Sequence, residues 1–596
     1  MQEEFDNLVD KIVRHLEFIY AEVELEKDYL TVAKELLDAM RLTPVNMQTP
    51  TPHSNLWDEK DVVLITYGDS VYEPAPELVE APLRPPLKTL SSFLHKYCIN
   101  AISHVHVLPF FPYSSDDGFS VIDYSTVNQG LGDWSHIESI SSDFGLMADL
   151  VINHCSSRSA WFQQFINDQP PGNKYFYTAS PDEDLSMVTR PRTSPLLRET
   201  KTPDDVKHVW CTFSHDQVDF DFSNPDVLVA FAKIIRLYMD KGTKIFRFDA
   251  IAFLWKKLNT SCINLPETHE AVRLLRTLIE YADNKVLIIT ETNIPNRENL
   301  TYFGNANEAH GIYNFSLPPL LVNTLLTGNC TYLKNWMMSM PPAQNGTFYF
   351  NFIASHDGIG LRPAEGLLDE SEIRQLTDCV LDFGGKISWR TLPDGTQKPY
   401  EMNIALIDAL KGTIHGEDEW QLERFICAHA IMFGLEGIPG LYIHSLLGTT
   451  NDYERVSNTG QNRGINRHRW EYPLLKSALD NVNTIHHRVL TKLTQLLHLR
   501  RAQRAFHPNA IQFTLQLGEK VFGYWRQSLD RKQSIFCISN ITTEEIAINL
   551  SDINLIGTDD WIDLITQETV SVDQVCLNLQ PYQTMWISNV FEKKSA

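Results

Sequence analysis

Short runs of apolar residues recur along the central part of the chain, each about as long as a β-strand. Eight such runs are bounded by polar or turn-forming residues, and stretches with helical spacing lie between most of them, as at 225–241 and 269–283. The runs are residues 61–69, 102–110, 146–154, 244–251, 285–292, 310–317, 347–356 and 438–446. Buried strands that alternate with helices predict an α/β fold, a (β/α)₈ barrel of the TIM type.

The two ends of the chain follow other patterns. Near the N-terminus, apolar positions recur at helical spacing at Leu8, Ile12, Leu16 and Ile19. With a second helix expected around 29–41, residues 1–55 are a predicted helical extension, and the catalytic barrel is expected at 56–507. Residues 508–596 alternate apolar and polar positions between turn signals, which predicts a C-terminal antiparallel β domain.

The third and fourth apolar runs are separated by about 90 residues. That spacing is too long for one strand-to-helix connection, and it contains Pro-rich and charged pieces. We therefore expect an inserted small domain at about 156–225, after the third strand, over the mouth of the barrel.

Composition narrows the choice of partners and location. The net charge of −24 argues against binding to nucleic acid or anionic membranes, which needs clustered Lys and Arg. No apolar stretch reaches about 18 residues, so no membrane span is expected. The nine scattered cysteines form no CxxC pair, and the N-terminal residues do not resemble a signal peptide, so we expect a cytoplasmic protein. Small molecules are the expected partners, and a homodimer is left open.

Polar residues stand at the ends of four of the apolar runs, where a barrel of this type has its active site. They are Asp149, Asn153, His154, Arg247, Asp249, Glu291, His356 and Asp357. Taken singly, such a residue is more often a helix cap or half of a buried ion pair. Three carboxylates that converge from separate strands, with histidines and an arginine among them, predict a catalytic centre.

The pattern suits transfer of a glycosyl group. Arg247 and Asp249 are two apart on one strand, so both point into the barrel, and the cation keeps the carboxylate ionised as a nucleophile requires. A second carboxyl group, Glu291, then acts as general acid and base in a retaining mechanism. This chemistry requires neither a metal nor a cofactor, and the sequence has no zinc spacing, calcium loop or nucleotide fingerprint.

The segments DLVINH, FRFDA, ITET and ASHD, in this order, resemble the signature regions of the α-amylase superfamily. The resemblance spans most of residues 60–500. It implies that Asp249 is the nucleophile, Glu291 the acid/base and Asp357 the group that stabilises the transition state. It also implies that three residues hold the sugar and the nucleophile, namely Arg247, His154 and His356.

Finer features resemble the sucrose-phosphorylase branch of that superfamily. They lie at 108–124, 189–192, 213–221, 259–262, 315–321, 356–360 and 462–467. By position, Asp116, Phe119 and Arg463 are implied to contact the donor glucose. Gln217 is implied to lie in the inner pocket, and Arg192 on a loop that binds phosphate or the acceptor.

Two departures from sucrose phosphorylases, the helical N-terminus and the loop DGIGLRPAEGLLDESEI, resemble the glucosylglycerate phosphorylases. These convert 2-O-α-glucosylglycerate and phosphate to α-glucose 1-phosphate and D-glycerate, reversibly. Glycerate and phosphate are both anions, so Arg190, Arg192 and Arg362 are expected to bind them. Alternatives are phosphorolysis of sucrose, sucrose 6′-phosphate or glucosylglycerol, then an α-glucoside hydrolase or transglucosidase. A non-catalytic amylase-like scaffold is disfavoured by the intact carboxylates.

Overall fold

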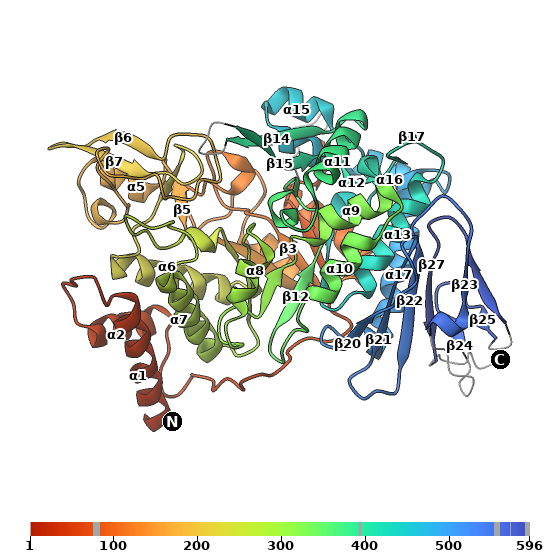
Figure 1. Ribbon diagram of the computed structural model, residues 1–596. Helices are drawn as coiled ribbons and strands as arrows, with labels where there is room; N and C mark the ends of the chain where they lie inside the picture. Colours follow the sequence, from red (N-terminus) through yellow and green to blue (C-terminus); the bar gives the residue numbers. More distant parts are fainter. Residues whose placement is uncertain (1, 75–83, 392–395, 554–560, 572–573, 590–596) are drawn as a thin grey trace.

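The eight apolar runs form one closed barrel of parallel strands in the computed structural model (Figure 1), which confirms the fold expected from the sequence. In chain order its strands are β1 (Val63–Thr66), β3 (His104–Val107), β4 (Gly145–Val151), β9 (Thr243–Asp249), β10 (Leu287–Thr290), β11 (Gly311–Tyr313), β12 (Phe348–Asn351) and β18 (Ile438–Tyr442). The structure describes residues 2–74, 84–391, 396–553, 561–571 and 574–589.

The register of β4, β9 and β10 sets the geometry of the barrel mouth. Asp149 on β4 lies opposite Arg247 on β9, and Val151 lies opposite Asp249. Phe248 in turn pairs with Thr290 at the end of β10. Because alternate residues of a strand share a face, Arg247 and Asp249 project to the same side as Asp149. Parallel strands end at one face, so these side chains gather there.

The N-terminal helices α1 (Gln2–Ile19) and α2 (Tyr29–Ala39) pack on barrel helices α7 (Pro266–Ala282) and α6 (Pro225–Asp240), respectively. The apolar stripe predicted for α1 is buried there. His15 contacts Glu270 at 2.5 Å, and Lys27 donates to Asp226 at 2.7 Å. The helical extension is therefore a layer over one side of the barrel.

An inserted segment leaves the barrel after β4 and returns at α6. It contains β5 (His154–Ser156), α5 (Ala160–Ile166), β6 (Leu197–Lys201), β7 (Val206–Trp210) and β8 (Gln217–Asp219). β6 and β7 form a hairpin, and β5 pairs antiparallel with β8. Residue His154 thereby lies opposite Asp219, and Gln217 reaches the barrel mouth beside it.

A second insertion, which the apolar pattern did not predict, follows β12. It forms an antiparallel sheet of β13 (Ile359–Gly360), β15 (Gln397–Asn403) and β14 (Lys386–Thr391), with helix α11 (Glu370–Asp382) between β13 and β14. These strands are mixed in polarity and lack the continuous apolar runs of the barrel strands, so the apolar pattern does not reveal them. The pairing of β15 with β13 places Glu401 opposite Gly360, three residues after Asp357.

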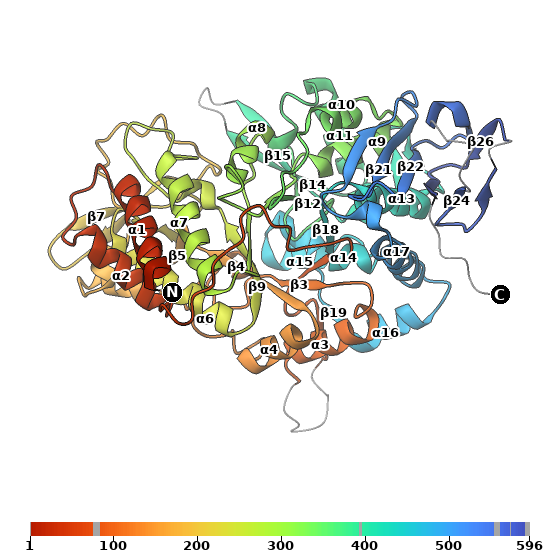
Figure 2. The ribbon, with the colours of Figure 1, turned by 90° about the horizontal axis from the view of Figure 1, so that it is seen from below.

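The C-terminal region is an antiparallel sheet in the order β20 (Ile511–Thr514), β21 (Val521–Gln527), β22 (Ser534–Asn540), β27 (Thr584–Ser588), β24 (Trp561–Asp563) and β25 (Thr569–Val570). It packs on α13 (Gln421–Gly434), where buried Arg526 donates to the carbonyl of Gly434 at 2.6 Å. The sheet and the N-terminal helices lie at opposite ends of the molecule (Figures 1 and 2).

The predicted domain boundaries, 1–55, 56–507 with an insertion at 156–225, and 508–596, stay predictions. Residues 554–560, 572–573 and 590–596 of the last segment lie outside the described residues. All nine cysteines are free thiols. Among the helices that the structure describes, none is both long and apolar enough to cross a bilayer.

Candidate active site

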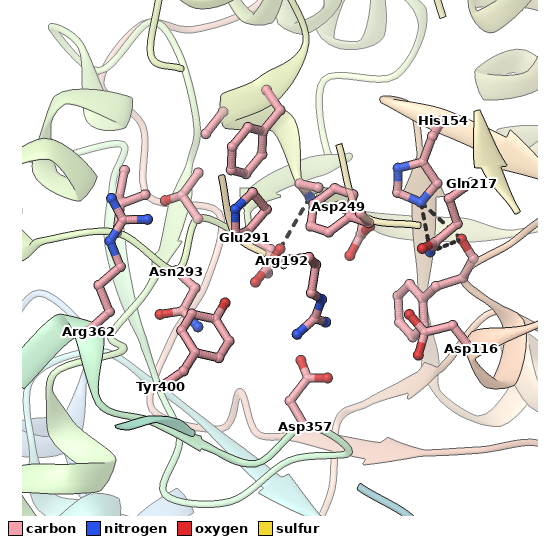
Figure 3. A pocket seen from close by; sticks show the side chains of 18 of the residues that line it. Asp116, His154, Arg192, Gln217, Asp249, Glu291, Asn293, Asp357, Arg362 and Tyr400 are labelled. Atoms are coloured by element: carbon pink, nitrogen blue, oxygen red, sulfur yellow. Dashed lines mark hydrogen bonds between the residues drawn. The ribbon is translucent and has the colours of Figure 1, made fainter. Parts of the chain in front are cut away.

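A pocket opens at the carboxyl ends of the barrel strands and gathers nearly all the predicted site residues (Figure 3). Those that line it are Asp116, Phe119, His154, Arg192, Gln217, Arg247, Asp249, Glu291, His356, Asp357, Arg362 and Arg463. Arg190 is the exception: its guanidinium donates to the carbonyl of Ser194, and it does not line this pocket. The structure therefore assembles the three predicted carboxylates in a single site.

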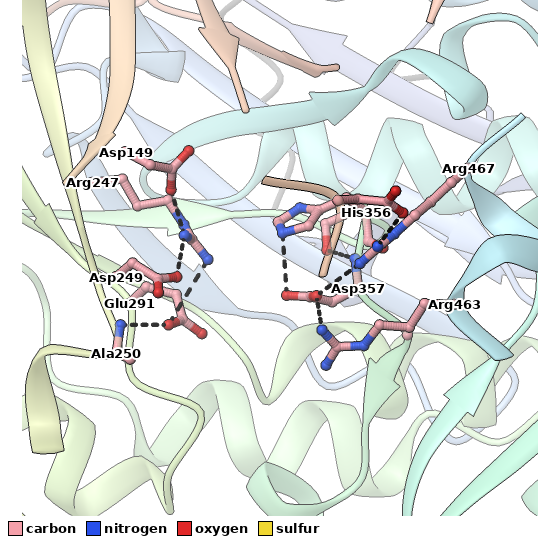
Figure 4. A network of polar contacts seen from close by, with 12 residues as sticks. Asp149, Arg247, Asp249, Ala250, Glu291, His356, Asp357, Arg463 and Arg467 are labelled. Carbon is pink, nitrogen blue, oxygen red and sulfur yellow. Dashed lines mark hydrogen bonds and ion pairs between the residues drawn. The ribbon is translucent and has the colours of Figure 1, made fainter. Parts of the chain in front are cut away.

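Asp249 ends strand β9 with an arginine fixed against it. Nη1 of Arg247 lies 2.7 Å from Oδ1 of Asp249 and 2.5 Å from Oδ1 of Asp149. The other oxygen of Asp149 contacts Nε2 of His106 at 2.6 Å. All four groups are buried. Asp149 thus holds Arg247 so that its charge faces the carboxylate of Asp249 (Figure 4).

Glu291 follows strand β10, and the backbone after Asp249 holds it. The amide of Ala250 donates to Oε2 of Glu291 at 3.2 Å. Ala250 has a φ of 52°, in the left-handed region that alanine seldom adopts. Such strain is tolerated where a site needs a particular geometry. Here the sharp turn after Asp249 directs an N–H at the second catalytic carboxyl group.

Asp249 and Glu291 lie together in the pocket, Asp249 buried and Glu291 largely so. Burial raises the pKa of both groups; Arg247 opposes this, and the charge of Glu291 adds to the rise at Asp249. Nη1 of Arg247 lies 2.7 Å from Asp249, whereas Nη2 lies 3.8 Å from Glu291. The cation therefore favours the ionised form of Asp249 more than that of Glu291. A retaining mechanism needs an ionised nucleophile and a protonated general acid.

Asp357 stays ionised for a different reason. Burial would raise the pKa of this carboxyl group, but Arg463, His356 and Arg467 outweigh it and hold the pKa below its usual range. Nη1 of Arg463 is 2.6 Å from Oδ1 of Asp357. Burial lowers the pKa of His356 to about 3, so its ring is neutral. The ring stacks on Phe119 with centroids 5.1 Å apart.

One end of the pocket is a closed hydrogen-bond network around His154. Its Nε2 lies 3.0 Å from the carbonyl of Phe119, and Nδ2 of Asn153 lies 3.2 Å from its Nδ1. Nε2 of Gln217 donates to the same carbonyl at 3.3 Å. Burial lowers the pKa of His154, which favours the neutral ring. These groups have a fixed arrangement before any ligand enters.

The other end presents cations. Arg362 lines it, Arg192 lies between it and the His154 end (Figure 3), and neither arginine is paired with a carboxylate among the described residues. The guanidinium of Arg192 lies over the ring of Tyr400, 5.9 Å from its centroid. Oδ1 of Asn293 is buried at this end without a hydrogen-bond partner. Because uncompensated charges and acceptors remain, this end is suited to an anionic ligand that carries hydroxyl groups.

Four further polar residues lie in or beside the site and were not predicted from the sequence: Asn293, Tyr400, Glu401 and Arg467. Asn293 stands two residues after Glu291 at a strand end, and that position is a signal that could have found it. Tyr400 and Glu401 belong to the unpredicted sheet, so only tertiary contacts bring them here. No cluster of three or more potential metal-binding His, Cys, Asp or Glu side chains occurs in the described part of the chain.

The chain is similar to known proteins in both sequence and structure. The model of the α-amylase catalytic domain matches residues 93–359. A glucosylglycerate phosphorylase from Spirochaeta thermophila is 39% identical over 98% of this chain and 99% of its own length. One from Escherichia coli is 39% identical over 89% of this chain and 92% of its own. The crystal structure of a sucrose 6F-phosphate phosphorylase from Thermoanaerobacter thermosaccharolyticum superimposes with a TM-score of 0.71 at 25% identity, covering 87% of this chain and 99% of that one.

Proposed function

This chain belongs to the glucosylglycerate phosphorylase family, and we propose that it catalyses the reversible phosphorolysis of 2-O-α-glucosylglycerate to α-glucose 1-phosphate and D-glycerate. The order of sequence identities favours this acceptor, because relatives with that name are 39% identical and a sucrose 6(F)-phosphate phosphorylase is 28% identical. The proposal also includes a cytoplasmic location, and it leaves a homodimer open.

The reaction is a double displacement on the paired carboxylates. Ionised Asp249 attacks the anomeric carbon while Glu291 gives its proton to the leaving glycerate oxygen. Phosphate then takes the place of glycerate and passes a proton to Glu291 as it attacks the glucosyl–Asp249 ester. Inversion occurs twice, so the product retains the α configuration. Asp357, held ionised by Arg463, stabilises the positive charge that develops on the sugar ring.

Two arginines of the pocket that lack a carboxylate partner support an anionic acceptor. Arg192 and Arg362 are not paired with a carboxylate in the described part of the chain, although the whole protein carries a net charge of −24. A guanidinium matches both a carboxylate and a phosphate with two parallel hydrogen bonds. One pair of cations therefore serves glycerate in one half-reaction and phosphate in the other.

An acceptor panel tests this proposal. The protein is given α-glucose 1-phosphate with D-glycerate, fructose, fructose 6-phosphate, glycerol or water, and phosphate release is measured. We expect D-glycerate to exceed fructose, glycerol and water by at least about 100-fold in kcat/KM, because a neutral acceptor leaves the half-buried Arg192 and Arg362 unpaired. D-glycerate should also exceed fructose 6-phosphate. In the reaction with D-glycerate, the product formed alongside phosphate should be 2-O-α-glucosylglycerate, which NMR identifies.

Asp249→Asn is the control for the same assay, with exposed Asp378→Asn as its matched surface change. The first should lose about 10⁵-fold in kcat because no glucosyl ester forms, and the second should lose nothing measurable. A preference for fructose or glycerol would reject glycerate as the acceptor while keeping the mechanism. Full activity of Asp249→Asn would reject the mechanism itself.

A further inference from the structure

Glu401 is a buried carboxylate on strand β15, outside the barrel, with only 2% of its surface exposed. Its two oxygens accept from Arg463, at 3.0 Å from Nε to Oε1 and 2.9 Å from Nη2 to Oε2. Oε1 also accepts from the backbone amide of Gly358 at 2.5 Å. An isolated buried charge is costly, so these three contacts account for its retention in this environment.

We propose that Glu401 is a positioning residue for catalysis, which fixes Arg463 so that Arg463 fixes Asp357. The remaining nitrogen of the guanidinium, Nη1, lies 2.6 Å from Oδ1 of Asp357. A guanidinium is planar, and a bidentate contact on its Nε–Nη2 edge determines the direction of Nη1. Arginine has several rotatable bonds, so without that contact its head could leave Asp357.

The same carboxylate also fixes the backbone beside Asp357. Gly358 is the next residue, and its N–H points at Oε1 of Glu401. A side chain at position 358 would collide with this carboxylate and with the carbonyl of Met402. The absence of a side chain at Gly358 therefore allows β15 to approach closely. Glu401 thus constrains Asp357 twice, through its ion-pair partner and through its neighbouring peptide.

The charge of Glu401 should also affect the pKa of Glu291, the proposed general acid and base. Arg463 lowers the pKa of Glu291, whereas Asp357 raises it. Glu401 compensates part of the charge of Arg463, so its neutralisation should lower the pKa of Glu291 further. The charged and titratable groups that face Glu291 are Arg247, Asp249, Tyr313, Asp357, Tyr400 and Arg463.

Glu401→Gln tests the proposal, because an amide keeps the shape and one acceptor oxygen but removes the charge. We expect kcat to fall about 30- to 100-fold, as for other losses of precise positioning, with KM for phosphate changed less than about 3-fold. A general acid acts in its protonated form, so a lower pKa of Glu291 should move the basic limb of the kcat/KM profile to lower pH.

Glu308→Gln is the matched control, since Glu308 is also buried and accepts from Arg273 and His269 at 2.6 Å each, away from the pocket. It should lower the melting temperature but leave the pH profile unchanged. A double-mutant cycle is completed by Arg463→Lys alone and by the double variant with Glu401→Gln. If Glu401 acts through Arg463, the loss of kcat in the double variant should be smaller than the two single losses combined.

The inference concerns glucosyl transfer and does not depend on the acceptor, so α-glucosyl fluoride serves as a second donor. If the unaltered protein consumes no glucosyl donor, the proposed function fails. If it does so and Glu401→Gln retains its kcat and pH profile, the positioning role fails. Additive losses in the cycle, or a loss of kcat explained by unfolding as in Glu308→Gln, would also overturn it.

Discussion

The two ends of the pocket differ in how far the protein satisfies its own polar groups (Figure 3). Around His154 and Gln217, side chains and backbone are joined in a network of hydrogen bonds. At Arg192, Arg362 and Asn293, cations lack a carboxylate partner in the described part of the chain and a buried oxygen has no hydrogen bond. The side chains around His154 and Gln217 therefore satisfy one another, whereas Arg192, Arg362 and Asn293 leave polar groups available to a ligand.

The difference follows from what each end must hold. The glucosyl group is the same in both half-reactions, so its surroundings gain from a fixed geometry that pays no ordering cost at the moment of reaction. The acceptor space must release glycerate and admit phosphate. Arginines that lack an internal carboxylate partner can exchange one anion for the other without first breaking an ion pair.

The largest effect that separates the two ends is expected from His154→Ala. Removing the ring breaks the contacts with Asn153 and the carbonyl of Phe119, so the glucose end loses its geometry. We expect kcat/KM to fall about 10²- to 10³-fold by the same factor for every acceptor. Phosphate release from α-glucose 1-phosphate with different acceptors measures this. A loss confined to anionic acceptors would contradict the division of the pocket.

Arg362→Ala should have the opposite selectivity and a smaller effect. We expect KM for phosphate and for glycerate to rise about 10- to 100-fold, since a hydrogen bond between charged groups is lost. Hydrolysis of α-glucosyl fluoride should change less than about 3-fold. Arg192→Ala should behave similarly.

Arg190→Ala is the matched control for these arginine variants. Its guanidinium contacts the carbonyl of Ser194 and does not line the pocket, so KM should stay within about 3-fold. Equal effects of Arg362→Ala on phosphate and on α-glucosyl fluoride would show that Arg362 does not belong to the acceptor end. An Arg190→Ala effect as large as that of Arg362→Ala would restore Arg190 as an anion-binding residue.

The smallest effect is expected at Tyr400, whose ring lies under Arg192. Tyr400→Leu removes the ring and should raise KM for phosphate about 2- to 5-fold, the size of one cation–π contact. Tyr400→Phe keeps the ring and should leave KM unchanged. Steady-state kinetics with varied phosphate compare the two variants. Equal values for the two variants would assign the contribution of Tyr400 to its hydroxyl or to packing.

Both the barrel and the carboxylates gathered at its mouth were predictable from local patterns. All eight apolar runs became barrel strands because parallel strands with helices on the outside are buried on both faces and read as continuous apolar segments. Asp249 and Glu291 stood out because a charge at the end of such a strand needs a partner or a use. The N-terminal helix was equally predictable, because the spacing of its apolar residues over 8–19 alone defines one buried face.

The order of polar residues along the chain thus determined which chemistry is present, whereas tertiary structure decided how it is arranged. No sequence pattern joined Glu401 to Arg463, or separated Arg190 from Arg192. Those relations depend on the pairing of β15 with β13 and on the direction of single side chains in loops. Strand and helix periodicities act over a few residues, but a bidentate ion pair between distant segments exists only once the whole chain has folded.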